Sequence, residues 1–381
     1  MSNFIKNRQK VALAMSGGVD SSTAAALLKE QGHEVIGVTM IVWPGKDQAA
    51  REAKKVADKL GIEHHVFDLS DEFRQKVVDV FINEYKQGRT PNPCIRCNRE
   101  IKFDLLWQEA KELGAEKLAT GHYARIMQNE ESCLPAGRCG MKNEGHVIYK
   151  LLKGKDPKKD QSYFLYVLDQ ARLSRTLFPL GELTKEEIRK KAKELGLSVH
   201  DKAESQEICF IDHDDYGAFL RLQCPEAVRS GDIVDQQGKV VGQHEGICFY
   251  TLGQRKGIGH YQGRPKYVVR LDPQKNQVVI GDQADVMGTE LAAEEINYIS
   301  GSIPEGDLAV MAKIRYNSPE AAAMLVPAPS TQHLEPACPA GRPRARLIFK
   351  ESQLAITPGQ SMVFYKGDEV IGGGLISSKD K

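Results

Sequence analysis

The sequence predicts an α/β protein in three parts: a doubly wound parallel-sheet domain, a small β-rich central domain and a C-terminal β-barrel. Two observations lead to this division. Over the first half of the chain, short apolar runs alternate with helix-forming segments, which favours a parallel sheet covered on both faces. From about Asp212, Gly-containing turns separate short Val/Ile-rich segments, and the helical periods vanish. We therefore expect domains at 1–211, 212–289 and 290–381.

Each expected element follows from its local pattern. Short apolar runs between polar turns predict strands, and Ala-, Leu-, Glu- and Lys-rich segments predict helices. In the first half we expect strands at Val11–Met15, Glu34–Val42, Glu63–Asp68 and Lys117–Thr120, and helices at Ser21–Lys29, Ala49–Leu60, Asp71–Tyr85, Ile101–Leu113 and Lys185–Leu195. In the second half we expect strands at Asp232–Val241, Lys266–Leu271, Gln277–Gly281, Leu308–Tyr316, Ala345–Phe349, Ser361–Tyr365 and Glu369–Ser377. The spacing of the last four suits a small barrel.

Composition limits the classes of function. A chain of 381 residues is longer than one hydrophobic core usually supports. Lys and Arg total 52 against 51 Asp and Glu, so any contact with nucleic acid must be a local patch. No apolar stretch is long enough to cross a membrane and the N-terminus is polar, so we expect a cytoplasmic protein with no membrane partner. Eight cysteines are too sparse for a secreted disulfide scaffold, so their positions matter more than their number.

A glycine-containing loop follows the first expected strand. The segment from Ser16 to Ser22 reads Ser-Gly-Gly-Val-Asp-Ser-Ser and leads directly into an expected helix. Two adjacent glycines allow a sharp turn and a close approach of the backbone to a ligand, and free amides at a helix start favour an anion. The segment lacks the glycine spacing and the lysine of a Walker loop. We therefore predict a phosphate-binding loop of another kind.

Ligands of doubly wound sheets bind beyond the carboxyl ends of the strands. Met15, Met40 and Gly121 all fall at such ends in the expected sheet. One bound nucleotide is therefore expected to touch all three.

Cysteines form the second informative feature. Cys97 follows a proline-rich, loop-like segment and precedes an expected helix, with Arg96, Arg99 and Lys102 nearby. A thiol at a helix N-terminus among cations is expected to have a lowered pKa and a useful fraction of thiolate. Cys209 lies between Ile208 and Phe210, a setting more typical of a small core residue.

The loop at Ser16 resembles the pyrophosphate loop of the N-type ATP pyrophosphatases (the PP-loop superfamily), which cleave ATP to AMP and pyrophosphate. With six further motifs in order, nearly the whole chain resembles the tRNA-specific 2-thiouridylase family. These motifs are Thr90-Pro91-Asn92-Pro93 with Cys97-Asn98, Gly121-His122-Tyr123-Ala124, 159–165 (Lys-Asp-Gln-Ser-Tyr-Phe-Leu), Ile208-Cys209-Phe210, 252–257 (Leu-Gly-Gln-Arg-Lys-Gly) and Thr357-Pro358-Gly359-Gln360.

The resemblance implies ATP-dependent 2-thiolation of the wobble uridine in a tRNA anticodon stem-loop. ATP adenylates the 2-carbonyl oxygen, and Cys209 delivers sulfur from a persulfide received from a sulfur-relay protein or a cysteine desulfurase. Cys97 resembles the nucleophile that releases the sulfur through a transient disulfide with Cys209. Two accessible thiols that can meet, one with thiolate character, suit persulfide transfer.

The resemblance also implies site residues. Those for ATP are Ala14, Met15, Ser16, Gly17, Gly18, Val19, Asp20, Ser21, Met40 and Gly121, with Asp20 counted as catalytic because it helps to place Mg²⁺. Those near the target base are Asn92, Pro93 and Cys94. Further contacts with tRNA are implied for His122, Lys159, Asp160, Gln161, Arg315, Tyr316 and Gln360.

Some features depart from the family pattern and leave alternatives open. Many members carry Asp where this chain has Cys94, and the change creates a three-cysteine set with Cys97 and Cys209. Three thiolates suit a four-iron, four-sulfur cluster with one open iron, whereas zinc lacks a clear fourth ligand. Segments around Cys133 and Cys338 lie outside the family motifs. Two rival functions are another PP-loop adenylating synthetase and a non-catalytic RNA-binding protein.

Overall fold

The computed structural model describes residues 8–130, 147–197, 208–211, 215–258, 260–261, 264–328 and 343–377. Cys133 and Cys338, which mark the two segments outside the family motifs, lie outside these described residues.

A parallel five-stranded sheet organises the N-terminal domain, and its strand order is β3-β2-β1-β4-β7. The expected doubly wound α/β class is confirmed, because β1 pairs in parallel with both β2 and β4 and the chain order reverses there. The strands are β1 (Lys10–Ala14), β2 (Glu34–Ile41), β3 (Glu63–Asp68), β4 (Lys117–Thr120) and β7 (Thr176–Leu177).

Helices cover both faces of this sheet and bury two separate apolar clusters. Ala24, Val56 and Ile188 represent one cluster, to which α1, α2 and α8 contribute. Phe73, Phe81 and Ile101 represent the other, beneath the helices from residue 70 to residue 112. The helices are α1 (Val19–Glu30), α2 (Gln48–Leu60), α3 (Ser70–Phe73), α4 (Asp79–Lys86), α5 (Pro93–Cys97), α6 (Leu106–Glu112), α7 (Gln170–Ser174) and α8 (Lys185–Glu194).

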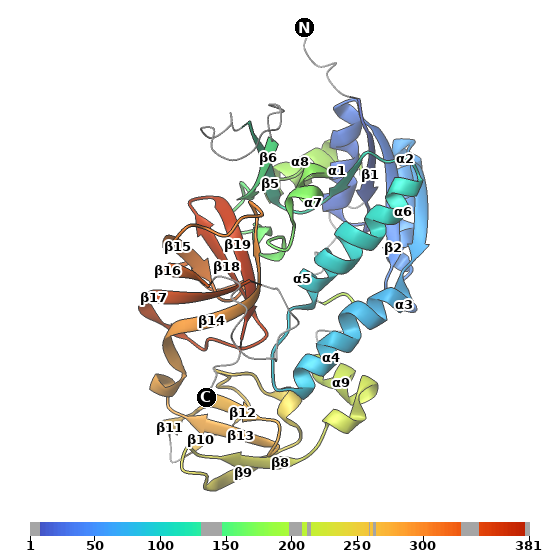
Figure 1. Cartoon of the computed structure of the whole chain (residues 1–381). Helices are drawn as coiled ribbons and strands as arrows, with labels where there is room; N and C mark the ends of the chain where they lie inside the picture. The colour runs from blue at the N-terminus through green and yellow to red at the C-terminus, as the bar shows by residue number, and fades with distance from the viewer. Residues whose placement is uncertain are drawn as a thin grey trace.

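Two of these helices join into one rod (Figure 1). A π-helical segment, Asn98–Leu105, connects α5 to α6 without a break. The sequence predicts this helix only from Ile101, so the rod begins two turns earlier than expected. Its start is explained by Pro93 in the first turn and by the Asn92 side chain, which accepts a hydrogen bond from the Cys94 amide at 3.1 Å.

The central domain contains a four-stranded sheet of order β12-β13-β8-β9. Its strands are β8 (Gly231–Val234), β9 (Val240–His244), β12 (Tyr267–Asp272) and β13 (Gln277–Gly281). The expectation that helices vanish after Asp212 is wrong, because α9 (Tyr216–Gln223) precedes the sheet. Asp215 caps this helix by accepting from the Ala218 amide, and Phe219 and Leu220 bury its inner face. The helix is too short to show a clear period in the sequence.

Six antiparallel strands form the expected C-terminal barrel, which closes through pairing of β14 with β19. They are β14 (Met287–Tyr298), β15 (Leu308–Lys313), β16 (Ala321–Ala328), β17 (Arg344–Leu354), β18 (Ser361–Lys366) and β19 (Glu369–Ile376). A hairpin from the first part of the chain, β5 (Ala124–Glu130) and β6 (Val147–Lys153), extends the same sheet, since β6 pairs with β19. The hairpin therefore ties the N-terminal domain to the barrel.

Candidate functional site

The phosphate loop connects β1 to α1 as expected. Gly17 has a φ of +68°, and a Cβ there would lie 2.6 Å from the Cβ of Glu52, so only glycine fits. The Ser21 hydroxyl oxygen accepts a hydrogen bond from the Ser16 amide at 3.1 Å, which closes the loop over the helix start. The turn at Gly17 and this hydrogen bond together fix the path of the loop into α1.

Neighbouring strand ends meet at this loop. The Met15 amide donates to the Val38 carbonyl on β2 at 2.8 Å, and Met40 lies two residues further along that strand. Gly121, just beyond β4, approaches the start of α1 so closely that a Cβ there would lie 3.1 Å from the Ser21 amide nitrogen. The structure thus brings the three strand-end residues to one edge of the sheet.

Asp20 is held by two residues that the sequence does not single out as site residues. Its carboxylate lies 2.7 and 2.9 Å from the ammonium of Lys185, and it accepts a hydrogen bond from the Tyr123 hydroxyl at 2.7 Å. Thr184 and Glu187 form a capping box that marks the start of α8 in the sequence. No local pattern indicates that the first residue of that helix reaches a loop 165 positions away.

The residues expected to contact tRNA after the hairpin form a scaffold beside Asp20. Gln161 binds the Tyr123 backbone twice, accepting its amide at 3.0 Å and donating to its carbonyl at 2.9 Å. The Asp160 side chain accepts the Gly154 amide at 3.0 Å, and its carbonyl accepts the Tyr316 hydroxyl at 3.2 Å. Asp160, Gln161 and Tyr316 therefore lie together, and Gln161 connects them to the phosphate loop through Tyr123.

The remaining residues expected to contact tRNA lie on different elements. The Lys159 amide donates to the Asp156 carbonyl at 3.1 Å in the turn before the scaffold. The guanidinium of Arg315 donates to the Leu354 carbonyl at 2.6 Å in the barrel. Gln360 donates to the Thr90 carbonyl at 2.8 Å, so this barrel residue reaches the segment that precedes the cysteines.

His122 is enclosed by aromatic rings. Its ring lies 6.0 Å from that of Phe103 and 6.1 Å from that of Phe178, and Nδ1 lies 2.7 Å from the Thr120 hydroxyl. Burial holds the pKa of the imidazole well below its usual value, and the nearby Lys102 ammonium acts in the same direction. His122 is therefore neutral near pH 7 and offers no positive charge to a phosphate.

Three cysteine thiols gather at one end of the cysteine-bearing rod. Cys94 and Cys97 belong to α5, and Cys209 comes from the short described segment 208–211. Charges on Cys94 and Cys209 both act on the Cys97 thiol, and a charge on Cys94 acts on Cys209, which places the three in one neighbourhood. Cys94 and Cys209 are exposed, whereas Cys97 is buried. The core position that the apolar neighbours of Cys209 favour is therefore not observed.

The lowered pKa expected for Cys97 is also wrong. Burial raises the pKa of Cys97 to about 12 and that of Cys209 to about 11. Cys209 has an exposed surface, but protein atoms surround its thiol on most sides. Cys97 is the fifth residue of α5, away from the free amides of the helix start, so the helix contributes little. Lys102 lowers the pKa of all three thiols, yet desolvation outweighs it.

The structure shows no preformed metal-ion site at the three thiols, and the iron-sulfur cluster stays an alternative. Among the described residues, which include all three thiols, no group of three or more His, Cys, Asp or Glu side chains is arranged to hold a metal ion. Asp20 is a single carboxylate, which suits Mg²⁺ because that ion usually takes most of its ligands from phosphates and water.

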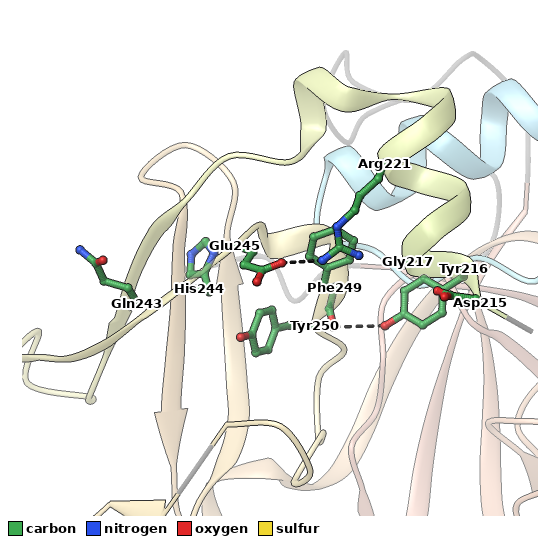
Figure 2. A pocket seen from close by; sticks show the side chains of 9 residues that line it. All are labelled: Asp215, Tyr216, Gly217, Arg221, Gln243, His244, Glu245, Phe249 and Tyr250. Carbon is green, nitrogen blue, oxygen red and sulfur yellow. Dashed lines mark hydrogen bonds and ion pairs between the residues drawn. The ribbon is translucent and has the colours of Figure 1, made fainter.

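A pocket lies in the central domain, between α9 and β9 (Figure 2). The Arg221 guanidinium stacks 4.3 Å from the Phe249 ring and pairs with Glu245, and the Tyr216 hydroxyl donates to the Phe249 carbonyl at 3.1 Å. Its cation is already paired with a carboxylate, and its lining residues include none of the phosphate loop or the three thiols. This pocket therefore lies apart from the phosphate loop and the three thiols.

The doubly wound sheet, the two-glycine loop without a Walker lysine and the carboxylate at the helix start are typical of the nucleotide-binding proteins of the PP-loop class. The matching families are described as a tRNA methyl transferase HUP domain over residues 9–213, a tRNA methyl transferase PRC-barrel domain over residues 218–282 and an aminomethyltransferase beta-barrel domain over residues 288–376. The tRNA-specific 2-thiouridylase MnmA of Clostridium perfringens is 45% identical, covering 97% of this chain and 99% of its own length. That of a Clostridium botulinum strain is 44% identical over 97% and 98%. The chain belongs to the tRNA-specific 2-thiouridylase family and is an enzyme of that family.

Among solved structures, an NH3-dependent NAD synthetase from Campylobacter jejuni is 20% identical. The match covers 58% of this chain and 78% of the synthetase chain, with a TM-score of 0.30. In the described part of the chain, every helix is too short or too polar to span a membrane.

Proposed function

We propose that this enzyme uses ATP to convert the wobble uridine of tRNA into 2-thiouridine, releasing AMP and pyrophosphate. The observation that carries the proposal is the joint arrangement of two sites. The two-glycine loop lies at the carboxyl ends of the parallel strands, and three thiols gather at one end of the rod that packs against the same sheet. Membership of the tRNA-specific 2-thiouridylase family supports the choice of substrate.

The first step is adenylation. The uridine 2-carbonyl oxygen attacks the α-phosphorus of ATP. The bond between that phosphorus and the oxygen that bridges the α- and β-phosphates breaks, and its electron pair leaves with pyrophosphate. The amides at the start of α1 and the turn at Gly17 would hold the phosphates. This step turns a poor leaving group into AMP.

The second step is sulfur transfer. The terminal sulfur of a persulfide on Cys209 loses its proton to solvent and attacks C2 of the adenylated uridine, and AMP leaves with the electrons of the C–O bond. Cys97 then gives up its thiol proton to water and attacks the Cys209 sulfur, and the S–S bond breaks to leave a thiocarbonyl on the base. A dithiol reductant must cleave the resulting Cys97–Cys209 disulfide before the next round.

The different exposure of the two thiols supports Cys209 as the sulfur carrier and Cys97 as the thiol that attacks it. Cys209 keeps an exposed surface, through which a persulfide donor, either a sulfur-relay protein or a cysteine desulfurase, would reach it. Cys97 is buried, and it lies near enough to Cys209 for a charge on that thiol to act on it.

The test is pyrophosphate release measured with three additions: no RNA, a tRNA with a wobble uridine, and the same tRNA with a wobble adenosine, which has no 2-carbonyl. We expect release only with the uridine tRNA. Release without RNA would instead indicate a small-molecule synthetase. Binding of tRNA without any ATP turnover would indicate an RNA-binding protein.

A further inference from the structure

Lys185 places a nearly buried ammonium against the phosphate loop. The residue is 9% exposed, and its nitrogen contacts both oxygens of the Asp20 carboxylate. It is the first residue of α8, whose start is fixed by the Thr184 capping box and by a hydrogen bond of 3.0 Å from the Lys185 amide to the Asp156 carboxylate. The position of the ammonium is thus set by the fold and not by the ion pair alone.

A structural link between α1 and α8 does not require this buried pair. The same two helices are joined by a second ion pair, Lys191 to Glu30 at 3.0 Å, which lies in a half-exposed setting where desolvation costs little. Burying an ammonium and a carboxylate costs free energy that their attraction barely offsets, so the Lys185–Asp20 pair is weak as a stabilising device. Because the Lys185–Asp20 pair lies at the phosphate loop, a role in binding phosphate explains its position better than stability does.

The loop needs a cation when ATP arrives. A triphosphate is strongly anionic, and the carboxylate of Asp20 at the start of α1 would repel it. A Walker loop solves the same problem with a lysine of its own, which this loop lacks. Lys185 reaches the loop from a distant helix and can exchange one anionic oxygen partner for another without moving its backbone.

We propose that Lys185 is a catalytic residue of adenylation, whose ammonium leaves Asp20 for oxygens of the β- and γ-phosphates when ATP binds. The proposal rests on the proposed ATP-dependent function. During attack on the α-phosphorus, Lys185 then stabilises the negative charge that collects on the departing pyrophosphate. The Tyr123 hydroxyl keeps its hydrogen bond to Asp20, so the released carboxylate stays in place and is available to Mg²⁺.

The test compares equilibrium binding of ATP, AMP and pyrophosphate to Lys185→Met, Lys185→Arg and the matched control Lys191→Met, by calorimetry on the full chain without tRNA. Loss of a charge-assisted contact is expected to weaken ATP and pyrophosphate binding by roughly ten- to a hundredfold in Lys185→Met. AMP lacks the β- and γ-phosphates, so its affinity should not change. Lys185→Arg should recover part of the affinity, and Lys191→Met should match wild type.

Other results would overturn the proposal. Equal loss of AMP and ATP binding in Lys185→Met would mean that the pair only holds the loop in shape, and unchanged ATP binding would mean that Lys185 never contacts the phosphates.

If Lys185→Met does not fold, Asp20→Asn decides instead. Without Mg²⁺ this variant should bind ATP at least as tightly as wild type, because Lys185 has no carboxylate to leave, and weaker binding would contradict the exchange. Failure of the proposed function would show separately, as ATP binding without tRNA-dependent AMP formation.

Discussion

The ionisation of the three cysteine thiols depends on burial more than on nearby charge. The sequence shows cations near Cys97 but does not show how deeply the thiol is packed, because packing is decided by residues far along the chain. Lys102 does act on the three thiols, as the sequence suggests, but desolvation reverses the net shift in pKa. The identity of the site residues is therefore easier to predict than their ionisation.

The raised pKa values predict an unusual pH dependence of alkylation. Thiolate is the reactive form, so a higher pKa moves the rise in rate to higher pH. Because the pKa is about 11 for Cys209 and about 12 for Cys97, both rates should still increase above pH 9, by about tenfold per unit for a thiolate-limited reaction. Peptide mapping after iodoacetamide treatment measures each cysteine separately. A plateau near pH 8 for either thiol would contradict the burial argument.

Lys102 supplies the opposing charge, and its removal should raise the thiol pKa values further. In Lys102→Met the alkylation of Cys209 at fixed pH is expected to slow by roughly threefold or more. Lys111→Met, an exposed lysine later in the same rod, is the matched control and should leave the rate unchanged. Equal rates in both variants would show that the Lys102 ammonium does not reach the thiols.

Among the helices, strands and loops, local sequence patterns predict the phosphate loop well and the cysteine-bearing helix only in part. Apolar β1, the two glycines and the Ala-rich α1 each follow from neighbouring residues, so the strand-loop-helix unit is readable in the sequence. The rod that carries Cys97 begins at Pro93, but its first turns contain no clear apolar period. The sequence therefore hides the part of the helix that matters for function.

The two glycines of the loop should respond differently to substitution. Gly17→Ala forces a left-handed φ of +68° and a contact of 2.6 Å with the Cβ of Glu52, so it is expected to cost about 1–3 kcal/mol and to lower the unfolding temperature. Gly18 has a φ of −90°, and a Cβ there meets nothing closer than 3.5 Å, so Gly18→Ala should leave that temperature nearly unchanged. Thermal unfolding by circular dichroism measures both. Equal shifts would mean that the loop is not held as tightly as described.

Across the whole molecule, long-range contacts hold the cysteine-bearing rod against the barrel. Gln360 of the barrel donates to the Thr90 carbonyl, and Arg99 of the rod pairs with Glu295 of β14 at 3.1 Å. These contacts join residues 196 to 270 positions apart, and no local pattern specifies such partners. The barrel itself is predictable from strand spacing, whereas its connection to the reacting thiols is not. The same limit explains why Lys185 is missed.

The most direct test of the proposed sulfur transfer is a single-turnover reaction with ATP, wobble-uridine tRNA and a persulfide donor, in which AMP and 2-thiouridine are measured in the same sample. Wild type and Cys133→Ser, a cysteine outside the family motifs, should form both products. Cys209→Ser should form AMP but no 2-thiouridine, because the phosphate loop remains intact while the sulfur carrier is lost. A normal yield of 2-thiouridine from Cys209→Ser would contradict the sulfur-transfer mechanism.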